Sequence, residues 1–577
     1  MEINRNTIIK DIVKKHPETL AVFRKYNLVV AGGVRGPNEP LAFFSKAHEV
    51  DYDEIARELK EAIEKGVDDS TEVVELKEDK VYEKFLKAAI LMTLTIGVTF
   101  GAALLTHIGM KKDFQTGFHS IVQVHGHAQL FGWVGLCIIG FAYYIVPRVK
   151  NTELNHSELT TTSFWLMIIG NILRIVAQPF SNETINVILP ISGLLECAAI
   201  LTFAFIIFST VLASKEKSEV YDKFIMAGVI WFLLSGFMNF FMDVYLFFTN
   251  THEIPSAVYS PFVHVFLLGF VFMFIFAVNI RTVYAFLDVR TIRVSAVNIT
   301  FWLLNITIPV YFVSNSLIYR FPSLLKISYL ATYLVAFSLL LFVFGIRVFE
   351  KSTKELDDIV MDRSYAKTIR AAYVWLIVGV LILGAKTFFR PFSEQQYLFH
   401  GAANHALTVG FVTMMIMGYA SKMIPTFKGI NMSSLCLSNL SFVLLNLGCF
   451  LRVSTQVMIG FKGEFYYSII GISGWIELVA IGMFGYNVWR TMNAEEGVEE
   501  VPGGSLSQIT KNTKISDVVD QYPETLEVFL QFGFKQLSNP VARRTIAKMF
   551  TVEQATKIHP VQIDDLLNAL NERIKKI

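Results

Sequence analysis

The stretch QVHGHAQLFGWVG, residues 123–135, places two histidines two residues apart inside an apolar segment that is long enough to cross a membrane. Ionisable side chains are costly in the hydrocarbon core of a bilayer, and those found there usually serve a function. His125 and His127 therefore predict a membrane helix that does more than pack against its neighbours.

The whole chain has the composition of a polytopic membrane protein. It has 577 residues, of which 53% are hydrophobic and 50 are Phe, and its mean hydropathy is +0.47. A helix needs roughly 20 apolar residues to span a hydrocarbon core of ~30 Å. Such segments occur twelve times, near 85–108, 119–147, 162–180, 185–213, 223–249, 257–280, 297–319, 325–348, 371–389, 399–425, 434–457 and 465–490. The sequence thus predicts an all-α protein with twelve membrane-spanning helices.

The loops between these helices differ in charge from one side to the other. Loops that share a side with both termini are rich in Lys and Arg, whereas the opposite loops carry only Lys111, Lys112, Arg320, Lys326, Arg390 and Lys462. The positive-inside rule then predicts cytoplasmic termini, in the cytoplasmic membrane of a bacterium or archaeon. The four cysteines form no CxxC pair, and no basic patch indicates nucleic-acid binding.

One pattern recurs in the second, sixth and tenth predicted helices. His127, His264 and His405 are each followed, five and six residues later, by Gly and then an aromatic residue. After His127 and His405 the agreement continues with Gly at offset 13 and Pro at offset 20. Internal similarity at fixed spacing indicates a repeated structural unit. We therefore expect three four-helix units, each with one histidine at the equivalent place.

Charged residues extend this repeat in the first and third units. Arg174 and Arg452 each lie 47 residues after the histidine, and Glu196 and Glu477 end the related strings SGLLE and SGWIE. An arginine within the bilayer needs a partner, and two options remain open. One is an ion pair with the glutamate of the same unit, and the other is the propionates of a bound haem. A proton path through either glutamate is a third use for these residues.

The angular positions of the histidines favour a large cofactor over a small ion. At about 100° per residue, His125 and His127 point about 200° apart, and His400 and His405 about 140°. Neither pair can bind one ion from a rigid helix, whereas planar cofactors between helices suit both. A histidine that recurs in three helices predicts a ring of ligands, although a single one is equally explained by a hydrogen bond to a neighbouring helix. The glycines that follow admit close approach of either a cofactor or a helix.

These segments resemble two related families. Twelve helices in three arcs, with histidines in helices 2, 6 and 10, resemble subunit I of the haem-copper oxidase superfamily. The strings HGHAQLFGWVG (125–135), AYYIVPR (142–148) and NHALTVGFVTMMIMGYASKMIP (404–425) are similar to the NnrS family. The resemblance implies a haem-containing, copper-associated membrane protein linked to nitric oxide metabolism, with more than one haem. It suggests haem ligation by His127, His405, His264, His125 and His400, and a further metal contact by His119.

The chain departs from the oxidase pattern where copper would bind. Leu268 stands four residues after His264 in place of the usual Tyr, and no histidine lies between His264 and His400. We therefore expect no ordinary oxygen reduction, and copper only at a site of another kind.

The two ends of the chain resemble each other. Residues 3–28 and 509–534 are identical at 12 of 26 positions when shifted by 506. Each segment is typical of two short helices separated at Pro17 or Pro523. They resemble small domains found beside hybrid-cluster and iron-repair proteins but lack the usual cysteines, which favours binding a protein partner, or each other, over a redox role.

The predicted organisation is therefore a membrane domain between two small helical domains joined to it by linkers. The boundaries, in chain order, are 1–66 (helical domain), 67–84 (linker), 85–490 (membrane domain), 491–507 (linker) and 508–577 (helical domain).

Three functions remain open from the sequence. The first is a haem protein that binds, detoxifies or reduces nitric oxide, as an oxidoreductase that takes electrons from a quinol or a donor protein. The second is a non-catalytic electron carrier in the membrane, with both axial positions of every haem filled. The third is a transporter with a path of His, Arg and Glu side chains. The histidines near one face argue against the third, because transporters of the inverted-repeat type bind near the bilayer midplane.

Overall fold

The computed structural model describes residues 3–26, 36–66, 80–114, 119–180, 185–494, 509–511, 513–534, 537, 550–558 and 561–574. Most of both predicted linkers, 67–79 and 495–507, lies outside the described residues. The contacts divide the chain into two units, Met1–Asn493 and Ala494–Ile577. We describe each unit by itself.

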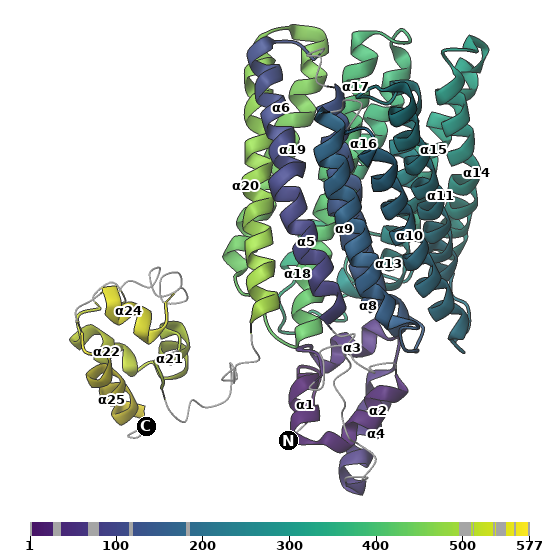
Figure 1. Ribbon diagram of the computed structural model, residues 1–577. Helices are drawn as coiled ribbons and strands as arrows, with labels where there is room; N and C mark the ends of the chain where they lie inside the picture. The colour runs from purple at the N-terminus through teal and green to yellow at the C-terminus, as the bar shows by residue number, and fades with distance from the viewer. Residues whose placement is uncertain are drawn as a thin grey trace. The chain divides into compact units, whose positions relative to one another are not determined.

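Twelve helices of the first unit are long and apolar enough to span a membrane, which confirms the prediction of an all-α polytopic protein (Figure 1). Across the described residues the structure contains only isolated β-bridges and no strand. The spans consist, in chain order, of α5 (Val81–Met92) with α6 (Val98–Lys111), α7 (His119–His127) with α8 (Leu136–Val149), α9 (Thr160–Ala177), α10 (Ile188–Ala213), α11 (Val220–Thr249), α12 (Ser256–Val265) with α13 (Phe272–Phe286), α14 (Val294–Leu317), α15 (Leu325–Ile346), α16 (Ser364–Ala385), α17 (Glu394–His405) with α18 (Met414–Lys428), α19 (Leu435–Lys462) and α20 (Phe465–Asn493).

Four spans contain a π-helical turn, which is a widened stretch of helix. These turns are η4 (Thr93–Gly97), η5 (Ala128–Gly135), η8 (Phe266–Val271) and η11 (Ala406–Thr413). The last three begin one or two residues after His127, His264 and His405. Single π-turns inside α-helices are rare and occur frequently at functional sites. The residues that share the sequence pattern thus also share an unusual backbone.

The glycines of the sequence pattern serve helix packing. A Cβ atom added at Gly269 would lie 2.6 Å from Cγ of Trp231, and one added at Gly410 would lie 2.6 Å from Cγ of Trp375. Each indole N–H also donates to an asparagine of a later span, at 2.8 and 3.0 Å. Of the two roles that the sequence left open for these glycines, close approach of a helix is the one observed.

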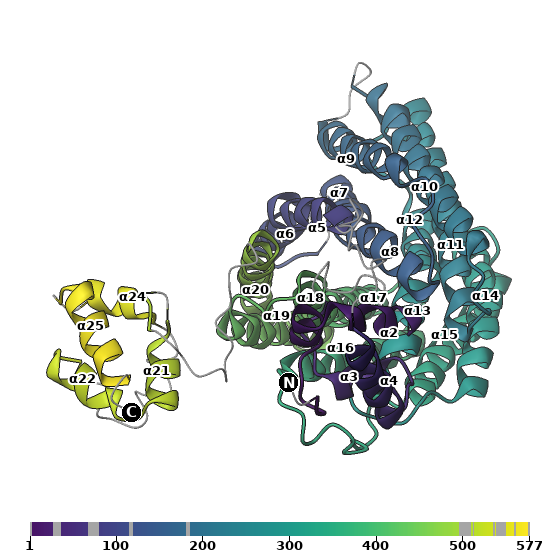
Figure 2. The same cartoon turned by 90° about the horizontal axis from the view of Figure 1, so that it is seen from below.

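The N-terminal domain docks on one end of the helix bundle (Figures 1 and 2). It contains α1 (Ile9–Lys15), α2 (Leu20–Lys25), α3 (Leu41–Ala47) and α4 (Tyr52–Lys65). Phe43 packs against Phe286 with ring centroids 6.1 Å apart, and Lys46 forms an ion pair with Asp288 in the loop after α13. Burial raises the pKa of Asp288, but hydrogen bonds led by the one from Lys46 outweigh burial and hold that pKa below its ordinary value. The docked domain therefore covers the end of the bundle where the even-numbered spans finish.

The C-terminal unit contains α21 (Ile515–Gln521), α22 (Thr525–Gln531), α24 (Val552–Ile558) and α25 (Ile563–Ile574). One backbone hydrogen bond illustrates its likeness to the N-terminal domain: Ile9 N–H donates to the Glu39 carbonyl at 3.0 Å, and Ile515 N–H donates to the Phe550 carbonyl at 3.2 Å. In this register, Gln554 takes the place of Phe43. Gln554 is exposed, so the apolar side chain with which the N-terminal domain docks is absent from this copy.

Candidate functional site

A cavity of about 630 Å³ lies at the end of the bundle opposite the N-terminal domain. Its walls come from the starts of α7, α12 and α17 and the ends of α6 and α14. Four histidines and two cationic side chains stand out in its lining, namely His119, His125, His400, His405, Lys386 and Arg452. His127 and His264 are not part of this lining.

Three histidines share one hydrogen-bonding arrangement. Nδ1 of His125 lies 2.6 Å from the Gly97 carbonyl, and Nδ1 of His264 and of His405 lie 3.1 and 3.3 Å from the carbonyl four residues earlier in the same helix. A carbonyl only accepts, so each Nδ1 carries the hydrogen and each Nε2 keeps a lone pair. Histidines that ligate metals are oriented in this way, through a backbone or carboxylate partner on the other ring nitrogen.

The first span makes room for His125. Its π-helical turn ends at Gly97, whose carbonyl accepts from the imidazole. One helical turn later, a Cβ atom at Gly101 would lie 2.7 Å from Cε1 of His125. Sequence reasoning missed both glycines, although the four-residue spacing of GVTFG (97–101) is a signal for close helix approach.

His127 is held differently from the other repeat histidines. Its Nε2 lies 2.7 Å from Oε1 of Glu196, and both side chains are buried. The sequence pattern placed His127 and His405 ahead of the other ligands. In the structure, His405 and His125 line the cavity and His127 does not, and haem ligation by any of them stays a prediction. Two residues spaced by about 200° cannot both face the same space, and the repeat by itself carries no information on which of them does.

His400 lies on the cavity with both ring nitrogens engaged. Lys386 Nζ lies 3.3 Å from its Nδ1, and Ser260 Oγ lies 2.9 Å from its Nε2. The ring also stacks against His264, with centroids 5.1 Å apart. His264 Nε2 is buried without a partner. Of this pair, His264 therefore has the nitrogen available for a ligand. His119 begins α7 and is exposed at the cavity wall.

Arg174 belongs to a buried polar network between the third, fourth and fifth spans. Its Nη1 donates to Asn239 at 2.8 Å and to Asp243 at 2.5 Å. Glu196, the partner considered from the sequence, accepts instead from Asn239 and pairs with His127. The ion pair is thus with Asp243 of α11. Asp243 was missed because the repeat pattern does not include it, although an aspartate inside an apolar span is itself a functional signal.

Arg452 has the equivalent sequence position but a different environment. It is buried and lines the cavity, and its Nε and Nη1 atoms have no hydrogen-bond partner. Oε1 of Glu477 is likewise buried and unpartnered. The predicted Arg452–Glu477 ion pair is not among the salt bridges of the described residues.

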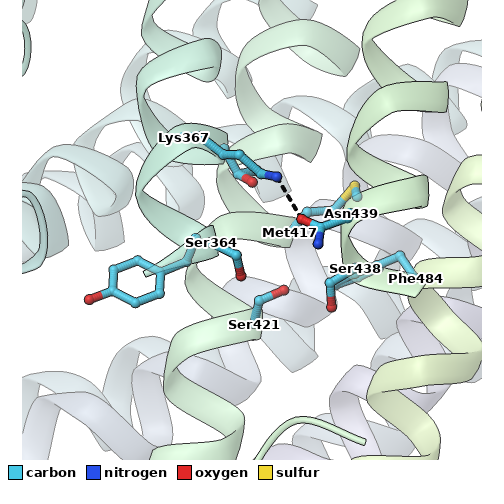
Figure 3. Close-up of a pocket in the computed structure, with 9 residues that line it drawn as sticks. Ser364, Lys367, Met417, Ser421, Ser438, Asn439 and Phe484 are labelled. Atoms are coloured by element: carbon cyan, nitrogen blue, oxygen red, sulfur yellow. Dashed lines mark hydrogen bonds between the residues drawn. The ribbon is translucent and has the colours of Figure 1, made fainter. Parts of the chain in front are cut away.

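A second, much smaller recess lies near the opposite end of the bundle. It has a volume of about 10 Å³, enough for about one water molecule, and Lys367 donates to Asn439 beside it at 2.6 Å (Figure 3). Across the part of the chain that the structure describes, no group of three or more His, Cys, Asp or Glu side chains could hold a metal ion. A compact copper site is therefore not found among these residues, and copper stays a prediction.

The sequence profile described as "NnrS protein" matches residues 84–495, which is most of the chain. The chain belongs to the NnrS family. This NnrS protein is thus an integral multi-pass membrane protein of a family associated with nitric oxide responses. This match confirms the resemblance to the NnrS family that is visible in the sequence. A second profile, "Domain of unknown function (DUF1858)", matches residues 509–567 within the C-terminal unit.

A curated relative connects this NnrS protein weakly with the oxidases. It is 44% identical over 55 residues to the Cbb3-type cytochrome c oxidase subunit CcoN1 of Stutzerimonas stutzeri. The matched stretch is 9% of this chain and 12% of that subunit. Such a short match is consistent with a haem-copper-like relation and does not extend to the activity of the whole subunit.

Proposed function

We propose that this protein binds haem in the cavity and that the haem binds nitric oxide. The observation that carries the proposal is the arrangement of His125 and His405, each of which donates Nδ1–H to a backbone carbonyl and keeps Nε2 for a ligand beside the same cavity. The cavity volume of about 630 Å³ falls within the roughly 300–1,000 Å³ typical of ligand pockets.

The remaining polar groups of the cavity suit a cofactor with carboxylates. Arg452 offers two buried nitrogens without partners, and such groups carry a large desolvation cost unless a ligand satisfies them. Haem would supply an iron that binds diatomic gases and accepts single electrons. In this proposal, one of His125 and His405 would hold the haem iron, the other would border the open face at which gas binds, and Arg452 would bind the haem propionates. His264 provides the nitrogen for a second haem, outside the lining of this cavity.

The orientation of the protein in the membrane follows from the charges of the loops between its spans. The N-terminal domain docks on loops that the charge distribution assigns to the cytoplasm. The cavity then opens toward the outer leaflet of a bacterial or archaeal cytoplasmic membrane. Gas reaches it from the membrane or the outer face, and electrons come from a quinol or a donor protein.

The two alternatives predict different behaviour. In an electron carrier, protein ligands fill both axial positions of every haem, so nitric oxide leaves the spectrum unchanged. In a transporter the histidines move protons or substrate, but here backbone carbonyls hold the Nδ1–H of three of them. That arrangement favours fixed ligands.

The test is an absorption spectrum of the purified protein with haem quantified by extraction. The matched variants are His125→Ala and His127→Ala, which lie two residues apart in one helix. We expect at least one of His125→Ala and His405→Ala to lose haem, and His127→Ala to retain it. Absence of a haem band in the wild-type protein, or loss of haem only in His127→Ala, contradicts the assignment. A ferrous spectrum that does not respond to nitric oxide contradicts the gas-binding part.

A further inference from the structure

Lys386 is a buried cation with no acidic partner among the described residues. It stands just past the end of α16, its side chain is almost fully buried, and it lines the cavity. Its two hydrogen bonds are long, at 3.3 Å to Nδ1 of His400 and 3.4 Å to the hydroxyl of Tyr311. An ammonium group has three hydrogens, so these weak contacts leave Lys386 able to donate to a ligand.

The ammonium of Lys386 determines which atoms donate and which accept in these hydrogen bonds. The ammonium only donates, so Nδ1 of His400 accepts and Nε2 of His400 carries the hydrogen. That hydrogen is donated to Ser260 Oγ at 2.9 Å. Asn404 Nδ2 lies 3.4 Å from the same Nε2, a longer contact that this tautomer does not use. The hydroxyl hydrogens of Ser260 and Tyr311 are then free to donate into the cavity.

The charge around this corner of the cavity is positive. The two cationic side chains in the lining, Lys386 and Arg452, are both buried, whereas the one carboxylate of the lining, Glu253, is exposed. A buried cation without a counter-charge is destabilising, and charged groups within membranes are nearly always paired. A ligand that brings a negative charge would supply the missing partner.

We propose that Lys386, Tyr311 and Ser260 form a binding site for a small anionic group, either a free oxyanion of the size of nitrite or the carboxylate of a bound cofactor. The ammonium supplies the charge, and the two hydroxyls supply hydrogen bonds to the oxygens. The inference rests on the proposed function for the choice of nitrite as probe, because nitrite shares its N–O chemistry with nitric oxide, and for the haem whose carboxylate is the other possible occupant.

The experiment measures nitrite binding to the purified full-length protein by isothermal titration calorimetry, together with the haem content of each preparation. The test variants are Lys386→Met and Lys386→Arg, and Tyr311→Phe serves as a second test because it keeps the aromatic packing. The control is Lys112→Met, since Lys112 is largely exposed, pairs with Glu464 and lies outside the cavity lining. Calorimetry does not require haem, so the anion site and the haem proposal can fail separately.

We expect nitrite affinity to fall at least tenfold in Lys386→Met, to fall less in Tyr311→Phe, and to be largely restored in Lys386→Arg. If nitrite does not bind the wild-type protein and Lys386→Met lowers haem content while Lys112→Met does not, the anion is the cofactor carboxylate. If Lys386→Met and Tyr311→Phe change neither nitrite affinity nor haem content, the proposed site is wrong.

Discussion

Arg174 and Arg452 share a sequence position, 47 residues after His127 and His405, yet their surroundings differ. Arg174 pairs with Asp243 and donates to Asn239 and Gln178. Arg452 has two nitrogens without partners and faces a cavity. Arg174 thus has a carboxylate as hydrogen-bonded partner, although its Nη2 and Oδ2 of Asp243 stay without a partner, whereas Arg452 has no salt bridge among the described residues.

The same difference applies to the glutamates, although their packing is alike. A Cβ atom at Gly170 would lie 2.6 Å from Cγ of Glu196, and one at Gly448 would lie 2.7 Å from Cγ of Glu477. Glu196 is held by His127 and Asn239, whereas Oε1 of Glu477 has no partner. The helix packing at the two glutamates is thus alike, whereas the polar groups that contact them differ.

The largest expected effect is the loss of stability in Arg174→Met. Arg174→Met leaves Asp243 buried without its counter-charge, and breaking a buried pair in this way costs about 3–5 kcal/mol. We expect a clearly lower thermal unfolding midpoint in detergent. Arg174→Met/Asp243→Leu, which removes both charges, is the control and should recover much of the loss. If Arg174→Met is as stable as the wild-type protein, the Arg174–Asp243 pair does not stabilise the bundle.

A smaller difference in stability is expected between Gly170→Ala and Gly448→Ala. Gly170→Ala forces Glu196 to move while two partners hold it, so overpacking should cost about 1–3 kcal/mol. Gly448→Ala meets the equivalent carbon of Glu477, whose carboxylate is less constrained, and should cost less. Unfolding midpoints of the two variants measure the difference. Equal losses, or a larger loss for Gly448→Ala, would mean that the two glutamates are held equally well.

The smallest change in stability is expected for Arg452→Met. Arg452 forms no salt bridge among the described residues, so its removal leaves no hydrogen-bonded carboxylate behind, and the haem-free protein should lose less stability than Arg174→Met loses. Haem retention should nevertheless fall, because the partner of the carboxylates is gone. Extraction of haem and unfolding of the haem-free protein, measured side by side, separate these effects. A strong loss of stability with unchanged haem content would assign Arg452 to the scaffold, as for Arg174.

Sequence reasoning predicted the spans, which the structure confirms, and named site residues whose roles stay predictions. Hydrophobic length and composition were enough for the twelve helices, because each must satisfy its backbone inside the bilayer. The repeat pointed to the helices that carry histidines but ranked His127 above His125. It also paired Arg174 with Glu196, because Asp243 lies in a helix that the pattern does not cover.

In the terminal domains, too, the sequence predicts the local fold but not the tertiary contacts. Their shared sequence predicts similar small helical folds, and the backbone hydrogen bonds of Ile9 and Ile515 agree with this. Docking of the N-terminal copy depends on single side chains such as Phe43 and Lys46, which meet partners far away in the chain. Such pairings cannot be read from either segment alone.

By itself, therefore, the sequence determined the membrane class, the spans, the family likeness and the helices on which chemistry was to be sought, because these depend on local composition and spacing. Only the tertiary structure decided which imidazole faces the cavity. The rotation of a helix about its axis is set by packing, here by Gly97 and Gly101 of the first span against His125. The same packing leaves Arg452 and Lys386 beside open space, and that is where a ligand is to be tested.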